Sequence, residues 1–242
     1  MKEKTFINIT NVSKNFDKKT IINNISFNVN QGEIVCLLGP SGAGKTTLIR
    51  LITGALKADS GKIEIGGVQV PSMSLYAKMG FMPQSDALYT DLSGFDNLLF
   101  FGNQYKIKSD ILKQEAIEIL TSLDLLDDKD KLVSKYSGGM RKRLSLAIAL
   151  LHKPTFLLLD EPTVGIDPIL RKAIWEQFYS LRSDGITIII STHVMDEAIK
   201  CDRTALIYEG TLVAFDLTEK LIEQTSSGNI EELFFMAKEG QL

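Results

Sequence analysis

Cysteine and histidine are scarce in this sequence, with two of each among 242 residues. Cys36 lies within an apolar run and Cys201 precedes Asp202, so reduced thiols are expected and neither a disulfide framework nor a metal site is favoured. His152 ends a helix-like run, where a histidine is commonly structural. The sequence therefore does not favour a fold that is stabilised by disulfides or by a metal ion.

Long apolar runs are also missing. The longest, such as residues 144–151, are well short of the ~20 residues that a bilayer span requires. No unbroken apolar segment follows the first lysines, so no signal peptide is predicted. We expect a soluble protein with no direct membrane insertion.

Charge of one sign is not in excess. Lys and Arg number 27 against 30 Asp and Glu, giving a net charge of −3. Such a chain has no basic field for nucleic acid, so no nucleic-acid partner is expected. Its hydrophobic content of 44% is ordinary, and the length fits one α/β domain with an inserted lobe.

Apolar patterns predict an order of strands. Alternation predicts antiparallel strands over 6–29. It also predicts a short strand or a hairpin turned at Gly66-Gly67 over 62–70, and a hairpin turned at Glu209-Gly210 over 204–215. Continuous apolar runs are typical of strands buried on both faces, and they occupy 34–38, 156–160 and 187–192.

Helical periodicity is found at 45–56, at 111–123 with Ser109 as its cap, and at 169–181 with Ala173, Ile174 and Phe178 on the inner face. The tail predicts two short helices around a Ser-Ser-Gly break. Phe234 and Phe235 would dock on the main domain, which is favoured over the alternative that they lie in a partner contact. A single domain, 1–242, is therefore expected. It would comprise a β-rich core (1–85 and 153–216), a helical subdomain (86–152) and a short helical tail (217–242).

The stretch GPSGAGKT at 39–46 fits Gly-x-x-x-x-Gly-Lys-Thr between a predicted strand and a predicted helix. Glycines let backbone N–H groups surround a phosphate, and the positive end of the helix dipole points at the same place. Lys45 supplies charge for the β- and γ-phosphates, and Thr46 offers a hydroxyl to Mg²⁺. The context disfavours a chance glycine-rich turn. The predicted nucleotide-binding residues here are Gly39, Pro40, Ser41, Gly42, Ala43, Gly44, Lys45, Thr46 and Thr47.

Two acidic residues end the strand FLLLD. Asp160 and Glu161 would stand at the carboxyl end of a buried strand, where α/β sheets hold their ligands. We expect Asp160 to hold Mg²⁺ through a water molecule and Glu161 to act as general base on an attacking water. A strand that simply reaches solvent in acidic residues is the alternative, and the phosphate loop argues against it.

A third stretch, YSGGM at 136–140, opens a basic helix. Ser137 is a plausible N-cap, and Gly138 and Gly139 leave N–H groups exposed for an anion. One compact chain has no use for two such sites on one nucleotide, whereas a head-to-tail dimer would. Read locally, a capped basic helix start is an equally good interpretation.

GPSGAGKTT, YSGGM and FLLLDEP, in that order, resemble the nucleotide-binding subunit of an ATP-binding cassette (ABC) transporter. The resemblance covers about residues 3–215. It implies a P-loop NTPase core with a mostly parallel sheet, an N-terminal antiparallel β subdomain and an inserted α-helical subdomain. It also implies ATP and Mg²⁺ as cofactors, and hydrolysis of ATP coupled to transport.

Four further residues receive roles only through this resemblance. Phe16 corresponds to the aromatic residue stacked on adenine, and Gln84 to the glutamine that reaches the metal and the attacking water. Asp167 matches the loop that couples the two sites of a dimer, and His193 the switch histidine on the γ-phosphate. Without the other motifs, each residue would be interpreted as core, surface, turn or strand end.

The sequence departs from the family pattern at three places. Tyr136 and Met140 replace the usual leucine and glutamine of the signature, but Ser137 and Gly139 are intact. Phe16 replaces the commoner tyrosine and keeps the aromatic face. The stretch from 136 to 168 most resembles cassettes of ABC-2 type bacterial exporters, including drug and antibiotic resistance pumps.

The resemblance implies partners and a location. A separate transmembrane permease would bind the chain, which would form a homodimer, or pair with a related cassette, when ATP binds. The protein would be cytoplasmic and peripheral on the inner face of the membrane. A soluble ABC ATPase of a scaffold-assembly or cell-division complex remains an alternative. A phosphotransferase would leave YSGGM unexplained.

Overall fold

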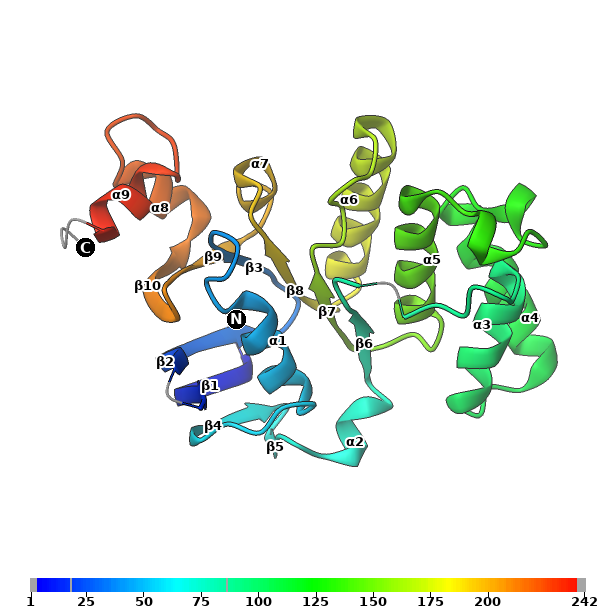
Figure 1. Cartoon of the computed structure of the whole chain (residues 1–242), viewed down its shortest axis with the longest axis horizontal. Coiled ribbons are helices and arrows are strands. Elements are labelled where there is room, and N and C mark those ends of the chain that lie inside the picture. The colour runs from blue at the N-terminus through cyan, green and yellow to red at the C-terminus, as the bar shows by residue number, and fades with distance from the viewer. Residues whose placement is uncertain (1–3, 18, 86, 239–242) are drawn as a thin grey trace.

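Two β-sheets organise the chain (Figure 1). The computed structural model describes residues 4–17, 19–85 and 87–238. Within them, one sheet has the order β2-β1-β4-β5, with bounds Lys19–Asn30, Thr5–Phe16, Ser60–Ile65 and Val68–Gln69. The other has the order β10-β9-β3-β8-β7-β6, with bounds Thr211–Leu217, Arg203–Tyr208, Ile34–Leu38, Thr187–Thr192, Phe156–Asp160 and Met79–Met82.

The first sheet is antiparallel, as the alternating pattern predicts. Ile7 pairs with Val29 and Ile9 with Phe27, and these four side chains are buried on one face. Ile65 pairs with Val68 across the Gly66-Gly67 turn. The antiparallel strands predicted over 6–29 are confirmed, and 62–70 forms the hairpin and not a single short strand.

The second sheet is parallel from β9 to β6, with β10 antiparallel at its edge. The strands β3, β7 and β8 are buried along their whole length, which confirms the prediction from continuous apolar runs. The strand β6 was not predicted, because MGFM is short and glycine weakens strand propensity. Gly80 is required there by close packing, since a Cβ would lie 2.2 Å from the Ala149 carbonyl oxygen.

The helix α1 (Lys45–Thr53) follows β3 and packs between the two sheets (Figure 1). It is shorter than the predicted 45–56. Gly54 adopts φ 77° and its N–H bonds to the Leu51 carbonyl at 3.1 Å, which ends the helix.

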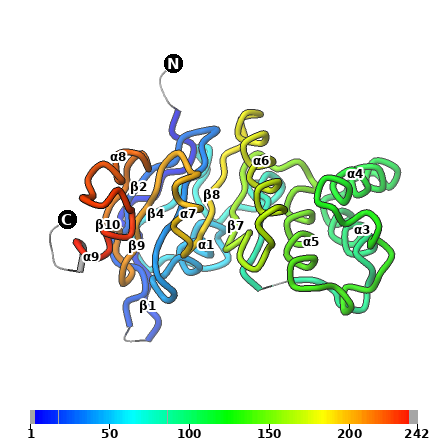
Figure 2. The backbone as a smooth tube through the Cα atoms, turned by 90° about the horizontal axis from the view of Figure 1, so that it is seen from above, coloured from blue at the N-terminus to red at the C-terminus, as the bar shows by residue number. Residues whose placement is uncertain are grey.

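Three longer helices, α3 (Gly94–Gln104), α4 (Ser109–Ser122) and α5 (Gly138–Leu150), lie together at one end of the molecule (Figures 1 and 2). Ser109 is not the cap of α4: it is the first helical residue, and the N-cap position falls on Lys108. The chain enters this helix one residue earlier than expected.

The helix α6 (Pro168–Ser183) lies beside α5 and contacts the interior strand β8 of the parallel sheet (Figure 1). Its inner face carries Ile174, Trp175 and Phe178, whereas Ala173 is exposed, against the prediction. The bulky Trp175 takes the buried position instead. The remaining short helical segments are α2 (Met73–Tyr76), α7 (Met195–Ala198), and the 3₁₀ turns Leu126–Asp128 and Val133–Lys135.

The parallel sheet has a hydrophobic core on each face, because successive side chains of a strand point to opposite sides. Val35 and Leu37 of β3 face α1 and the antiparallel sheet. Ile34, Cys36 and Leu38 face the other core, which continues into the helices α3 to α6. Both cysteines are buried free thiols, as expected.

The tail forms two short helices, α8 (Thr218–Glu223) and α9 (Glu232–Lys238), beside β9 and β10 (Figures 1 and 2). The Glu232 carboxylate accepts hydrogen bonds from the N–H and hydroxyl groups of Ser226 and Ser227, which lower its pKa to about 2. Phe234 packs on the core, as predicted, but Phe235 is 61% exposed.

Across the described part of the chain, every helix is too short or too polar to cross a membrane.

Candidate nucleotide site

The predicted site residues come from loops at one edge of the parallel sheet. The phosphate loop follows β3, Glu161 follows β7, His193 follows β8 and Gln84 lies two residues after β6. Because these strands are parallel neighbours in the order β3-β8-β7-β6, their carboxyl ends meet at the same edge. The fold therefore collects residues that are far apart in sequence.

The phosphate loop is supported from outside by two hairpins. Gly44, at the start of α1, has φ 103°, and a Cβ there would lie 2.8 Å from the Cδ1 atom of Ile22 on β2. The Gly210 N–H, in the β9–β10 turn, donates to the Ala43 carbonyl at 3.1 Å. The loop is thus held in the shape that leaves the N-terminus of α1 open.

Lys45 is buried inside this loop. Its ammonium donates to the carbonyl oxygens of Gly39 at 2.7 Å and Pro40 at 2.9 Å. Burial lowers the pKa of Lys45, and the nearby carboxylates of Glu161 and Asp160 oppose that shift. Both carboxylates are therefore electrostatically coupled to the lysine.

Ser191 bonds to both acidic residues at the end of β7, Asp160 and Glu161. Its hydroxyl donates to Oδ1 of the buried Asp160 and accepts the Glu161 N–H at 3.1 Å. The Ser191 carbonyl accepts the same N–H at 3.1 Å. Glu161 has φ 54°, a left-handed conformation that costs about 1–3 kcal/mol outside glycine and persists where surroundings fix it.

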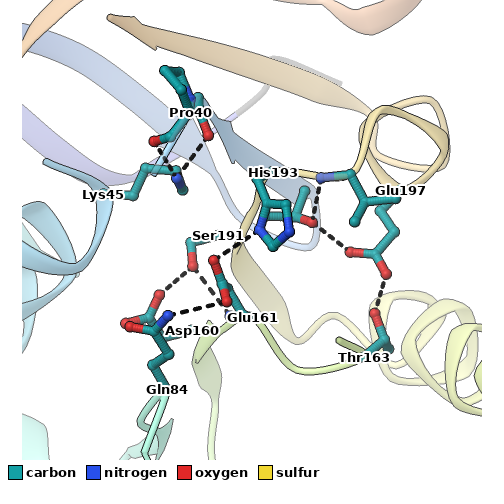
Figure 3. A network of polar contacts seen from close by, with 12 residues as sticks. Pro40, Lys45, Gln84, Asp160, Glu161, Thr163, Ser191, His193 and Glu197 are labelled. Atoms are coloured by element: carbon teal, nitrogen blue, oxygen red, sulfur yellow. Dashed lines mark hydrogen bonds and ion pairs between the residues drawn. The ribbon is translucent and has the colours of Figure 1, made fainter. Parts of the chain in front are cut away.

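The Glu161 carboxylate is held from both sides (Figure 3). The Gln84 amide Nε2 donates to Oε2 at 3.1 Å, and His193 Nδ1 lies 3.0 Å from Oε1. The Glu161 side chain is only 12% exposed and that of His193 42%. Three predicted catalytic residues are thus in direct contact.

Lys142, on α5, ties the helical region to this centre. Its ammonium donates to the main-chain carbonyls of Gln84 at 3.0 Å and Glu161 at 3.3 Å. The sequence carries no signal for this role, because a basic run such as RKR at 141–143 usually points to solvent.

A second buried carboxylate fixes the neighbouring loops. Glu197, 1% exposed, accepts hydrogen bonds from the hydroxyls of Thr163 and Thr192 (Figure 3). The contact to Thr192 measures 2.7 Å. It links the segment after β7 to the end of β8, and so positions Glu161 relative to His193.

Two small cavities open at this centre. Thr46, Gln84 and Asp160 line one of about 180 Å³, and Thr46, Lys45 and Glu161 border another of about 170 Å³. A hydroxyl, an amide oxygen and a carboxylate are hard oxygen ligands that suit Mg²⁺, which takes its remaining ligands from water and phosphate. Within the described residues no cluster of three or more His, Cys, Asp or Glu side chains could hold a metal ion. These residues fit Mg²⁺ bound together with a nucleotide.

The signature residues belong to a different surface. Ser137 caps α5 by accepting the Met140 N–H at 3.2 Å, and Asp167 caps α6 by accepting the Leu170 N–H at 3.0 Å. Among residues 4–17, 19–85 and 87–238, no hydrogen bond links Ser137, Gly138, Gly139 or Asp167 to the phosphate loop. Within one chain they do not join the centre around Glu161.

Phe16 lies at the end of β1 and is 47% exposed, with the Lys14 ammonium 5.6 Å from its ring centroid. Its place beside adenine stays a prediction.

Comparison with known proteins decides the family. The ABC transporter family model matches residues 22–164, more than half of the chain. The chain belongs to the ABC transporter family. As a member, it is the ATP-binding subunit, an ATPase whose hydrolysis of ATP is coupled to transport.

Two curated relatives of this ABC subunit are bacterial. The linearmycin resistance ATP-binding protein LnrL of Bacillus subtilis is 40% identical, over 94% of this chain and 76% of its own length. The Nod factor export ATP-binding protein I of Burkholderia lata is 39% identical, over 94% and 76% respectively.

Solved structures have the same fold as this ABC subunit. An ATP-binding subunit of an ABC transporter superposes with a TM-score of 0.87 at 23% identity, covering 97% of this chain and all of the other. The cbiO1 protein of Clostridium perfringens gives 0.80 at 27% identity, covering 92% of each chain. The predicted fold class is confirmed, and so is the predicted family. The division into subdomains and the individual site roles stay predictions.

Proposed function

We propose that this ABC subunit hydrolyses ATP with Glu161 as the general base, and that two copies, driven by ATP, power a membrane exporter. One observation carries the catalytic part: the Glu161 carboxylate is held by Gln84 and His193 at the mouth of the phosphate loop. A carboxylate fixed in this way is oriented before the substrate arrives.

Binding of ATP falls to the loop 39–47 and the start of α1. The N–H groups of the first turn and the Lys45 ammonium face the β- and γ-phosphates. To reach them, Lys45 exchanges its contacts with the Gly39 and Pro40 carbonyls for phosphate oxygens. Phe16 stacks on adenine through its exposed ring face.

Mg²⁺, when bound, neutralises charge on the phosphates and polarises the γ-phosphoryl group. Thr46, Gln84 and Asp160, which line one cavity, are the residues that would hold it. Ser191 keeps the Asp160 carboxylate oriented by donating to one of its oxygens.

Glu161 accepts a proton from the attacking water. Gln84 orients that water and His193 contacts the γ-phosphate, since both side chains already border the carboxylate. Glu197, through its hydrogen bonds to Thr163 and Thr192, fixes the loop after β7 relative to the loop after β8.

Two copies complete the site. The N-terminus of α5, with Ser137, Gly138 and Gly139, faces the nucleotide on the partner's phosphate loop, and Asp167 couples the two sites. ATP binds the closed pair better than the open one and so shifts the population toward closure. Removal of the γ-phosphate reverses the shift.

A transmembrane permease binds the chain, and closure of the two copies moves the part of the permease that contacts them. The apolar groove of about 480 Å³ between β6, α3 and α5 is its proposed seat. Phe81 and Pro83 line both this groove and the cavity next to Gln84, so they connect the two regions. The export named for the Nod factor relative and the resistance named for the linearmycin relative support an ABC-2 type exporter. The chain would be held at the inner face of the membrane by its permease.

Affinity purification of the tagged chain from detergent-solubilised membranes tests the transport part. An integral membrane protein with several spans, at near-equal stoichiometry, is the expected companion. Recovery with a cytosolic complex alone would overturn the transport proposal. ATPase activity that persists in excess EDTA would overturn the assignment of Mg²⁺.

A further inference from the structure

A cavity outside the catalytic centre lies between the phosphate loop and the tail. It measures about 460 Å³ and has an apolar wall made of Met195, Tyr208, Phe234 and Phe235. Its opposite rim consists of Pro40, Ser41 and His193, with Gly39 and Glu231 completing the lining. The cavity therefore borders the nucleotide site directly.

The wall that α9 contributes is held in place from within. Leu233 is fully buried and Phe234 packs on the core, while Phe235, one residue further, is 61% exposed. The loop before α9 is tied to Glu232 by Ser226 and Ser227. An aromatic ring on a fixed helix thus stands open beside the phosphate loop.

A second exposed apolar residue lies outside the lining of this cavity. Ile169, in the first turn of α6, is 86% exposed. The segment that leads to it passes the signature helix, because a Cβ built on Gly139 would lie 3.7 Å from the Gly165 carbonyl oxygen. Ile169 and the start of α5 therefore belong to one face.

Head-to-tail pairing sets that face against the partner's phosphate loop. If Ser137 meets the nucleotide, the adjacent segment 165–169 meets the rim next to it, which is formed by Pro40, Ser41 and His193. An exposed isoleucine then faces an open apolar cavity twice, once on each side of the two-fold axis.

We propose that the cavity between α9 and the phosphate loop receives Ile169 of a second copy, so that the tail is part of the ATP-dependent dimer face. This inference rests on the head-to-tail pairing of the proposed function. As a consequence, the tail contacts the second copy only in the closed dimer, because Ile169 enters the cavity only when the two chains meet.

Sedimentation of the Glu161→Gln chain with ATP and Mg²⁺ gives the reference dimer Kd, since slow hydrolysis preserves the ATP-bound state. Ile169→Asp and Phe235→Asp, both at exposed positions, each raise that Kd by about tenfold or more. Ile111→Asp, on α4 and 50% exposed, is the matched control and leaves it within about twofold. The double variant Ile169→Lys with Phe235→Asp dimerises better than Phe235→Asp alone.

Cross-linking tests the contact itself. Ile169→Cys and Phe235→Cys chains, mixed and treated with an oxidant, form a mixed disulfide dimer only with ATP and Mg²⁺, whereas Ile111→Cys with Phe235→Cys does not. A reference Kd unchanged by both Asp variants, or the absence of that cross-link, overturns the docking while the pairing stands. A reference chain that remains monomeric with ATP overturns both the pairing and the docking.

Discussion

The two halves of the proposed ATP site differ in how they are built. Around Glu161, residues from the carboxyl ends of three neighbouring strands, β6, β7 and β8, contact each other, with Gln84, His193 and Ser191 all bonded to one residue. Around Ser137 and Asp167, each side chain only caps its own helix. The first half is preorganised by the sheet edge, and the second is presented outward.

This difference assigns different tasks to the halves. A preorganised centre needs little reorganisation when water attacks the γ-phosphate, so the chemistry belongs there. A helix end with free N–H groups can bind an anion only when one is brought to it. The comparison therefore predicts that variants of the first half lose chemistry or binding in one chain, and variants of the second half lose only what depends on pairing.

Glu161→Gln has the largest expected effect. The amide cannot accept a proton from water, so the ATPase rate falls by about 10²–10⁴-fold, while ATP still assembles the dimer. Steady-state phosphate release and sedimentation with ATP measure the two outcomes. Glu64→Gln, on β4 and paired with Lys62, is the control and keeps the rate. A Glu161→Gln rate close to that of the parent would remove Glu161 as the base.

Lys45→Ala is expected to weaken ATP binding by about 10–10² fold, because charge-assisted hydrogen bonds to phosphate contribute about 1.5–3 kcal/mol each. Equilibrium binding of a fluorescent ATP analogue to the monomer measures the change. Lys57→Ala, in the loop after α1, serves as the matched lysine. Normal affinity in Lys45→Ala would contradict the phosphate-loop assignment and with it the contrast between the halves.

Sequence patterns predicted the strands better than the links between them. Runs such as IVCLL and TIIIST identify buried strands, because a strand that is buried on both faces needs apolar side chains at nearly every position. MGFM gave no signal, since the strand β6 is defined by its neighbour β7 and not by its own residues.

The same limit applies to the site. GPSGAGKT and FLLLDE carry their chemistry in local order, so Lys45, Asp160 and Glu161 could be named in advance. Ser191, Lys142 and Glu197 could not, because their roles arise from contacts with residues 19 to 58 positions away in the chain. Ser191 had the best available signal, as it precedes Thr192 and His193 at a strand end.

Ser137→Ala tests the outward half. The variant loses a cap, at about 1 kcal/mol of stability, and a hydroxyl for the partner's nucleotide. Hydrolysis is expected to slow about tenfold in the paired state, with ATP affinity of the monomer unchanged. Ser93→Ala removes the corresponding cap of α3, on the Asp96 N–H, together with the hydrogen bond from Ser93 to the Asp96 carboxylate. It separates the two losses, because it destabilises the chain at least as much and keeps the rate. If Ser137→Ala weakens ATP binding by the monomer, Ser137 acts on the nucleotide site of its own chain, and the proposed division between the two halves is wrong.

Lys142 lies between the halves, and its replacement has the smallest expected effect. The ammonium on α5 donates to the carbonyls of Gln84 and Glu161, so it joins the helix that carries Ser137 to the centre that carries out the chemistry. In Lys142→Met, kcat falls about three- to tenfold because two hydrogen bonds of about 1 kcal/mol each no longer position those loops, while KM for ATP is unchanged. Lys142→Arg restores most of kcat, since the guanidinium can still donate to both carbonyls. Lys172→Met, on the exposed side of α6, leaves both constants unchanged. If Lys142 only stabilised the fold, Lys142→Met would lower the melting temperature and leave kcat unchanged. That result would mean that α5 does not position the loops that carry Gln84 and Glu161.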